Sequence, residues 1–313
     1  SPDIPLNVSR SYLQSDANVK KISTYITKKV ADRLDEILRN ERQQLEEKWD
    51  NLKLCIEYDM LSDEKFRDRA MKFCLLKNTE GKYFSIEDYK KAIEDEQTDK
   101  DKKVVFLYAT DVEGQYSFIE SAKAKGYDVL LMDCQLDSHF VNLLETKVEN
   151  SRFARVDSDS IDNLIPKEDK IKPQLSETDQ EDLSVIFQAV LPKDNQYYVQ
   201  ADNLGDDAAP ILITQSEFMR RYREMSAMGG GMNFYGEMPQ MYNIIVNMEN
   251  PLVGQILAAA ESHKDDLAAF AGSSDMLKQI TDLALLANGM LKGKDLSDFI
   301  ARSAKVVEDA YLK

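Results

Sequence analysis

The sequence holds few of the residues that most often build metal or redox sites. Its two histidines, His139 and His263, show no HxH or HExxH spacing, so a histidine-based metal or acid–base site has little to draw on. Its three cysteines, Cys55, Cys74 and Cys134, are widely spaced and form no CxxC pair. We therefore expect no metal site, and the cysteine usage favours a reducing, cytoplasmic setting.

Positive charge and long apolar runs are also scarce. The 313 residues carry 40 Lys and Arg against 56 Asp and Glu, a formal net charge of −16. A surface that binds DNA or RNA needs clustered Lys and Arg, which no segment supplies, so we expect no nucleic-acid partner. No apolar run approaches the roughly 18 residues of a membrane span, so we expect no membrane partner. The chain begins at Ser1 without Met, and we expect it to be part of a longer protein.

What the sequence does contain is enough apolar material for two domains, 43% of its residues. In residues 1–100, apolar side chains recur at steps of three and four from Val19 to about Trp49, which predicts one long amphipathic helix. Further helical patterns cover Leu61–Leu76 and Ile86–Ile93, the latter with Ser85 as a candidate cap. We expect this helical unit to contain no strand.

The spacing of the apolar residues changes from a helical to a strand-like pattern in residues 101–165. Two β-branched and aromatic blocks, Val104–Tyr108 and Tyr127–Met132, flank a helical pattern at Phe118–Lys125. Strand, helix and strand at this spacing predict a βαβ unit with parallel strands. A helix at Leu136–Leu144 follows, which gives a small αβα layer.

An acidic, proline-bearing segment separates this first domain from the rest. Residues 157–182 hold nine acidic and three basic side chains and two prolines, so we place a linker there and the domain boundary near Pro173. The first domain is thus residues 1–172 and the second 173–313. In the second, strands at 197–201, 211–214 and 242–248 alternate with helices at 182–190, 216–228 and 251–262, and helices at 276–288 and 296–312 close the chain. The predicted fold class is mixed α+β, ending in a helix pair.

Four stretches of sequence carry a resemblance to a known family. Residues 5–14 read Pro-Leu-Asn-Val-Ser-Arg-Ser-Tyr-Leu-Gln, and matching segments follow in order at 104–110, 126–132 and 244–253. The chain resembles the ninety-kilodalton heat-shock chaperones over its whole length, from late in their middle domain through their C-terminal dimerisation domain. It ends at Tyr311-Leu312-Lys313, without the acidic tail that recruits helical-repeat cochaperones, so it is similar to the bacterial members and no such cochaperone is expected.

The resemblance implies a role for Arg10 and Gln14. In the family, the arginine of this motif reaches the γ-phosphate of ATP held by an N-terminal domain, and the nearby glutamine supports the loop. A guanidinium suits this task because its planar donors neutralise phosphoryl charge. The residues alone favour an ordinary surface pairing of Arg10 with Asp3 or Asp16, and the motif match reverses that preference. The sequence has no Gly-rich phosphate loop, so we expect neither cofactor nor ATP hydrolysis in this chain, with ATP and magnesium used by the full-length protein.

Two segments are candidate contacts for client proteins. Seven of the twelve methionines fall within residues 219–248, around a helix that ends in three glycines. Such a face suits promiscuous apolar binding, although a methionine stripe is often simply core. The candidate residues are Phe218, Tyr222, Met225 and Met228. The resemblance implies a second strip at His139, Phe140 and Asn142, for which a solvated helix face is the alternative.

The closing helices are candidates for a dimer contact. Each helix carries an apolar stripe, and packing the two helices against each other leaves much of both stripes uncovered. We therefore expect a second copy of the chain to contribute two more helices and complete a four-helix bundle. Packing within the chain against Leu252–Leu257 is the alternative. The candidate interface residues are Leu277, Ile280, Ala284, Leu296, Phe299, Ile300 and Val307.

Together these features predict part of an ATP-dependent, stress-response chaperone that binds partly folded clients as a homodimer. One rival is a small α/β ligand-binding enzyme with its site at the carboxyl ends of the βαβ strands, near Thr110, Asp111, Asp133 and Cys134. The other rival is a nonenzymatic dimeric scaffold, which would lack client binding.

Overall fold

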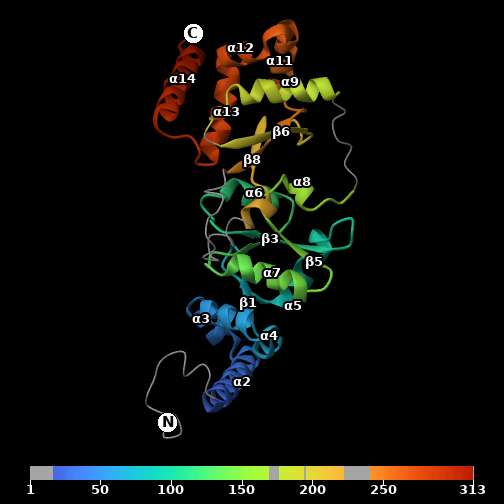
Figure 1. Cartoon of the computed structure of the whole chain (residues 1–313), viewed down its shortest axis with the longest axis vertical. Helices are drawn as coiled ribbons and strands as arrows, with labels where there is room; N and C mark the ends of the chain where they lie inside the picture. Colours follow the sequence, from blue (N-terminus) through green and yellow to red (C-terminus); the bar gives the residue numbers. More distant parts are fainter. Residues whose placement is uncertain (1–16, 169–175, 194, 222–239, 313) are drawn as a thin grey trace. The chain divides into compact units, whose positions relative to one another are not determined.

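The computed structural model describes residues 17–168, 176–193, 195–221 and 240–312 (Figure 1). The chain forms two compact units. The first contains the described residues up to Thr98 together with 103–110 and 126–153, and the second contains 99–102, 111–125 and the described residues from Ala154 onward. The boundary predicted at Pro173 stays a prediction, because residues 169–175 lie outside the described ranges.

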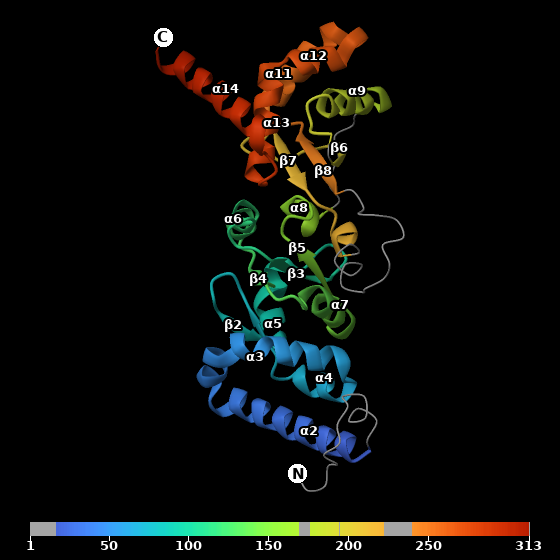
Figure 2. The same ribbon diagram turned by 60° about the vertical axis from the view of Figure 1, so that its left-hand side comes forward.

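The first unit begins with three helices, whereas the sequence predicted one long helix from Val19 to about Trp49 and a second at Leu61–Leu76. The helices are α2 (Ala17–Asn40), α3 (Arg42–Ser62) and α4 (Glu64–Ala70). The single helix expected from Val19 to Trp49 is wrong, because the chain breaks at Glu41, whose φ of −141° is not helical. The break lets α2 lie alongside both α3 and α4 (Figure 2), so that Ala31 and Trp49 enter one core.

A β-hairpin corrects the prediction that this part contains no strand. Strand β1 (Leu75–Lys77) pairs antiparallel with β2 (Tyr83–Ser85). The turn is built by Asn78, whose side-chain oxygen accepts the backbone N–H groups of Glu80 and Lys82, and by Gly81 at φ +80°, a conformation that favours glycine. The helix expected through Leu76 therefore ends with α4. Ser85 caps α5 (Ile86–Gln97) by accepting from Asp88 N–H, as predicted.

The predicted parallel strand pair is confirmed. Strand β3 (Val104–Ala109) is buried throughout and runs parallel to β4 (Val129–Leu131), with Leu107 opposite Val129. The predicted helix between them is α6 (Tyr116–Ala124), which groups with the second unit. An unpredicted strand, β5 (Ser151–Arg155), gives the sheet order β4-β3-β5. Helix α7 (Asp137–Lys147) follows β4, and the Phe106 and Phe153 rings stack 4.6 Å apart in the core of the unit.

The second unit is a mixed sheet with helices. After α8 (Ile161–Leu164) and α9 (Glu177–Gln188), strands β6 (Gln196–Asp202), β7 (Ile211–Thr214) and β8 (Met241–Asn247) form a sheet in the order β6-β8-β7, parallel between β6 and β8 and antiparallel between β7 and β8. This arrangement confirms the α+β class.

Helices complete the second unit. They are α11 (Pro251–Ala260), α12 (Leu267–Ser273), α13 (Asp275–Ala287) and α14 (Gly293–Tyr311), with a 3₁₀ helix, η1 (Glu261–Asp266), after α11. Helix α9 contacts β6 and α13 contacts β7, whereas α14 projects away from the sheet (Figure 2). Within the described ranges, no helix has the length and apolar character needed to cross a lipid bilayer.

Candidate functional site

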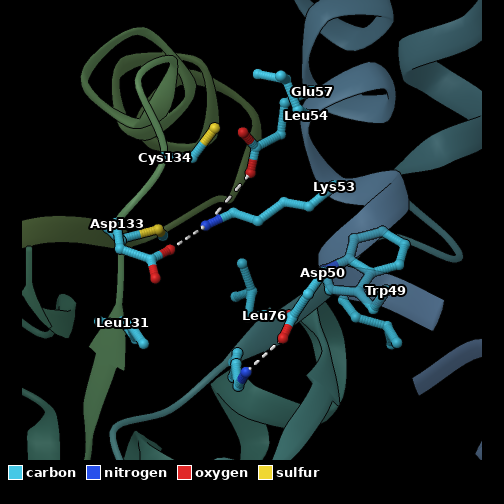
Figure 3. Close-up of a pocket in the computed structure, with 12 residues that line it drawn as sticks. Trp49, Asp50, Lys53, Leu54, Glu57, Leu76, Leu131, Asp133 and Cys134 are labelled. Carbon is cyan, nitrogen blue, oxygen red and sulfur yellow. Dashed lines mark hydrogen bonds and ion pairs between the residues drawn. The ribbon is translucent and has the colours of Figure 1, made fainter. Parts of the chain in front are cut away.

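A cluster of charged side chains, largely buried except for Asp133, joins α3 to the loop after β4 and to the start of α7 in the first unit. The Lys53 ammonium on α3 lies 3.4 Å from Asp133 Oδ1 and 3.9 Å from Glu57 Oε1 (Figure 3). It also lies 3.2 Å from Asp137 Oδ2. Asp137 Oδ2 also accepts the backbone N–H of Cys134 at 2.7 Å. Lys53 and Glu57 are four residues apart on one helix face, which is why both reach the same loop.

Burial sets the protonation of this cluster. The Glu57 side chain is only 2% exposed, and its burial, together with the nearby charge of Asp137, raises the pKa of Glu57 to about 8 against the pull of Lys53. Burial also raises the pKa of Asp137, opposed by Lys53 and by the Cys134 N–H. Burial alone would lower the pKa of Lys53, but Asp137 and Glu57 outweigh it and the pKa is raised. At neutral pH, Lys53 is therefore charged and Glu57 holds a proton.

A cavity of about 280 Å³ opens beside the cluster. Figure 3 shows the Lys53 ammonium lying between the side chains of Asp133 and Glu57, with the Cys134 side chain next to that of Glu57. The rest of the lining is mostly apolar and includes Trp49, Leu54, Leu76, Leu131 and Met132. Three donor atoms, one each from Glu57, Cys134 and Asp137, lie within 4.8 Å of one another and are the group in the described chain suited to hold a metal ion.

The sequence analysis named two of these residues and missed three. Asp133 and Cys134 were candidates for the rival enzyme, and the structure does bring them together, but with Lys53, Glu57 and Asp137. Asp111 serves its own loop instead, where its Oδ1 accepts the N–H groups of Glu113 and Gly114. The signal that could have found the cluster was the Lys53–Glu57 spacing opposite the end of a predicted strand.

The candidate strip on α7 is only partly exposed. His139 and Asn142 are half-buried, but Phe140 is 1% exposed and belongs to the core of the first unit. The assignment of Phe140 to a client contact is corrected, because Phe140 lies with Val141 and Leu144 on the buried side of α7.

The Met-rich segment is described only at its start. Phe218 is 73% exposed, whereas Tyr222, Met225 and Met228 lie outside the described residues, as do Arg10 and Gln14. The start of this helix is held by Glu217, whose carboxylate pairs with Arg220 at 2.9 Å and with Arg221 at 2.5 Å, and accepts the backbone N–H of Arg155 at 3.3 Å. Phe218 is thus an exposed ring on an anchored turn.

The candidate dimer residues divide into two groups. Four are buried inside their own subunit, where they join the core around Val253 and Ile256, so for them the intrachain alternative holds; these are Leu277, Ile280, Ala284 and Phe299. Leu296 is half-buried against the same core. Ile300 and Val307 are exposed, and so are Leu283, Leu286 and Val306, which the sequence analysis did not name.

Comparison with known proteins identifies the family. The family model described as "Hsp90 protein" matches residues 1–311. The chain belongs to the Hsp90 family. It is 46% identical to the chaperone protein HtpG of Bacteroides fragilis strain YCH46, over 98% of this chain and 54% of that protein. It is 44% identical to the HtpG of Porphyromonas gingivalis, over 98% of this chain and 53% of the relative.

A more distant relative, the HtpG of Roseobacter denitrificans, is 24% identical over 99% of the chain and 49% of its own length. This Hsp90-family chain therefore spans about half the length of the curated relatives that it matches. The family assignment agrees with the resemblance seen in the sequence.

Proposed function

We propose that this chain is the dimerising and client-binding part of an ATP-dependent chaperone. The observation that carries the proposal is the apolar surface that the second unit leaves exposed on α14 and at Phe218. Curated relatives are named chaperone proteins, which agrees with such a surface. Exposed apolar groups gathered on one element mark sites where other proteins bind.

The dimer contact is proposed at the outer face of α14. Ile300, Ala304, Val307 and Tyr311 recur at steps of four, three and four, so they share one helix face, and all four are exposed. Within the described structure, α14 buries only Phe299 and every residue after Ser303 is exposed. Such an unsupported helix end is marginal in water, because most helix stability in proteins comes from packing. A second copy of α14 supplies that packing.

The test of the dimer uses charge on this face. Changing both Ile300 and Val307 to Asp removes roughly 1.5 to 3 kcal/mol of apolar burial for each side chain and adds charge repulsion across the twofold. Sedimentation velocity should show the wild-type chain as a dimer and the double variant as a monomer. Lys305→Glu, on the other side of the helix, is the matched control and should remain dimeric. A dimeric double variant would remove α14 from the proposed interface.

Client binding is proposed at Phe218 and the Met-rich segment that follows it. Apolar burial is non-directional, so an exposed ring beside flexible methionines accepts many unfolded sequences. His139 and Asn142 are proposed as a secondary contact. Phe218→Ser should weaken suppression of aggregation of a heat-unfolded model protein by roughly tenfold, because one buried ring contributes about 1.5 to 3 kcal/mol.

Tyr198→Ser provides the control, since Tyr198 is another exposed ring, on β6 of the same unit. It should leave aggregation suppression unchanged. Equal loss in the two variants would mean that any exposed ring serves, and no loss in either would contradict the Phe218 site. If the chain suppresses no aggregation at all, the scaffold alternative takes the place of this proposal.

The proposal for ATP concerns the longer protein. Arg10 is proposed to contact ATP that an N-terminal domain holds with magnesium, and Gln14 to support it. In the full-length protein, Arg10→Ala should lower ATP turnover by a factor on the order of a hundred or more, as expected for a cation that stabilises a transferring phosphoryl group. Arg33→Ala, an exposed arginine on α2, should not. The chain of residues 1–313 alone should show no turnover.

A further inference from the structure

The strongest feature outside the proposed chaperone surfaces is the cluster of Lys53, Glu57, Asp133, Cys134 and Asp137. Three carboxyl groups and a thiol meet a single ammonium there. Lys53 is held by two of the carboxyls, at 3.2 and 3.4 Å, and lies 3.9 Å from the third, Glu57. Glu57 is therefore the most distant of the three carboxyl partners of Lys53.

The donor atoms have the composition and spacing of a metal site. One oxygen of Glu57, one oxygen of Asp137 and Cys134 Sγ lie within 4.8 Å of one another. A tetrahedral zinc ion holds such donors at about 2.0 to 2.3 Å, so neighbouring donors sit roughly 3.5 Å apart. Side-chain rotations of about 1 Å close the difference. All three residues belong to the first unit, so no movement between units is needed.

Two buried oxygen atoms independently point to a missing ligand. Glu57 Oε2 and Asp137 Oδ1 are buried and accept no hydrogen bond from the described residues. Both side chains are more than nine-tenths buried, at 2% and 5% exposed. A buried carboxyl oxygen without a partner is costly and calls for a bound proton, water or cation. On Glu57 a proton takes this place at neutral pH, and a bound cation would replace that proton. Asp137 Oδ2 stays with Lys53 and the Cys134 N–H, which leaves Oδ1 for the ligand.

We propose that Glu57, Cys134 and Asp137 bind one zinc-like divalent cation, with the fourth position open to the cavity beside them. A thiolate with two carboxylates selects a borderline cation such as Zn²⁺ over Mg²⁺ or Ca²⁺, which prefer oxygen donors alone. At neutral pH, binding releases two protons to solvent, one from the Cys134 thiol and one from the Glu57 carboxyl, because the deprotonated groups coordinate. Glu57 and Cys134 line the 280 Å³ cavity, which supplies space for a water as the fourth ligand.

The test is a titration of the metal-free chain of residues 1–313 with Co²⁺, a zinc substitute whose bond to a thiolate produces a near-ultraviolet charge-transfer band. The band should saturate at one equivalent and disappear when Zn²⁺ is added. It should be lost in Cys134→Ser and kept in both Cys55→Ser and Cys74→Ser. Glu57→Gln and Asp137→Asn should each weaken Co²⁺ binding by at least about tenfold.

Two results would overturn the site. If the wild-type chain gives no band at excess Co²⁺, Lys53 is the only cation that the cluster accepts. If the band survives Cys134→Ser or vanishes in Cys55→Ser, the metal binds elsewhere, at an exposed thiol. Circular dichroism establishes that each variant is folded, and the wild-type titration decides the question even if one variant does not fold.

Discussion

Helices α13 and α14 follow each other in the chain and both carry apolar stripes, yet they end in different environments. Leu277 on α13 is fully buried, and its neighbours Ile280 and Leu285 join the same core beneath the sheet. Helix α14 buries Phe299 alone and leaves Ile300 58% exposed. An amphipathic pattern therefore shows that a helix has a face to cover, but not whether its own chain or a second molecule covers it.

Substitutions at the buried positions of α13 should lower the free energy of unfolding without changing dimerisation. Leu277→Ala removes a fully buried side chain and leaves a cavity, so it should lower the free energy of unfolding by about 2 to 5 kcal/mol. Leu286→Ala, at an exposed position on the same helix, is the control and should change it by less than about 0.5 kcal/mol in the monomeric Ile300→Asp/Val307→Asp background. Urea denaturation measures both. Equal effects would show that α13 is not anchored in the core.

Burial also affects an ionisable group, Glu57 in the first unit, and so makes the stability of the chain depend on pH. The folded-state pKa of Glu57 is raised to about 8, above its unfolded value, so the folded chain binds the extra proton between these values. Stability from this group is complete below the unfolded pKa and is lost as the pH rises toward 8. Between about pH 6 and pH 8, wild type should therefore lose roughly 2 kcal/mol relative to Glu57→Gln, measured by denaturation with a chelator present. Parallel pH profiles would contradict the burial of an ionisable Glu57.

The smallest expected effect concerns the attachment of α14 to α13. Gln279 Nε2 donates to Ser303 Oγ at 2.7 Å, one of the few polar links between the two helices. Gln279→Ala should cost about 0.5 to 1.5 kcal/mol, as is usual for one hydrogen bond. A double-mutant cycle with Ser303→Ala isolates the bond. A coupling energy of zero would show that this hydrogen bond does not hold α14 in place, which would leave the Arg302–Asp282 ion pair and the apolar contacts of Leu296 and Phe299.

Local sequence signals predicted much of the fold. The Ser85 cap, the parallel strands β3 and β4, and the helix pair at the chain end all follow from periodicity and capping chemistry. The β1–β2 hairpin was missed because its strands are three residues each, too short for a period to show. The last helix was predicted to begin at residue 296, but α14 begins earlier, at Gly293.

The candidate sites were harder to predict, because they depend on which face of each helix packs against the core. Phe140 directly follows three polar residues, 137–139, yet the packing of α7 buries it. Glu57 and Asp137 are 80 positions apart and meet only because α3 packs against α7. The resemblance of residues 5–14 to a family motif gave the family directly, but not which apolar residues of the closing helices remain exposed.

The exposed end of α14 gives the most direct test of the proposed dimer. Truncation after Ser303 removes residues 304–313, of which the described residues 304–312 are all exposed, and leaves Leu296 and Phe299 in their contacts with the core. Sedimentation velocity of the truncated chain should give a monomer, beside a dimer for the intact chain, while circular dichroism shows an unchanged fold. A truncated chain that sediments as a dimer would contradict the assignment of the α14 face to a second copy.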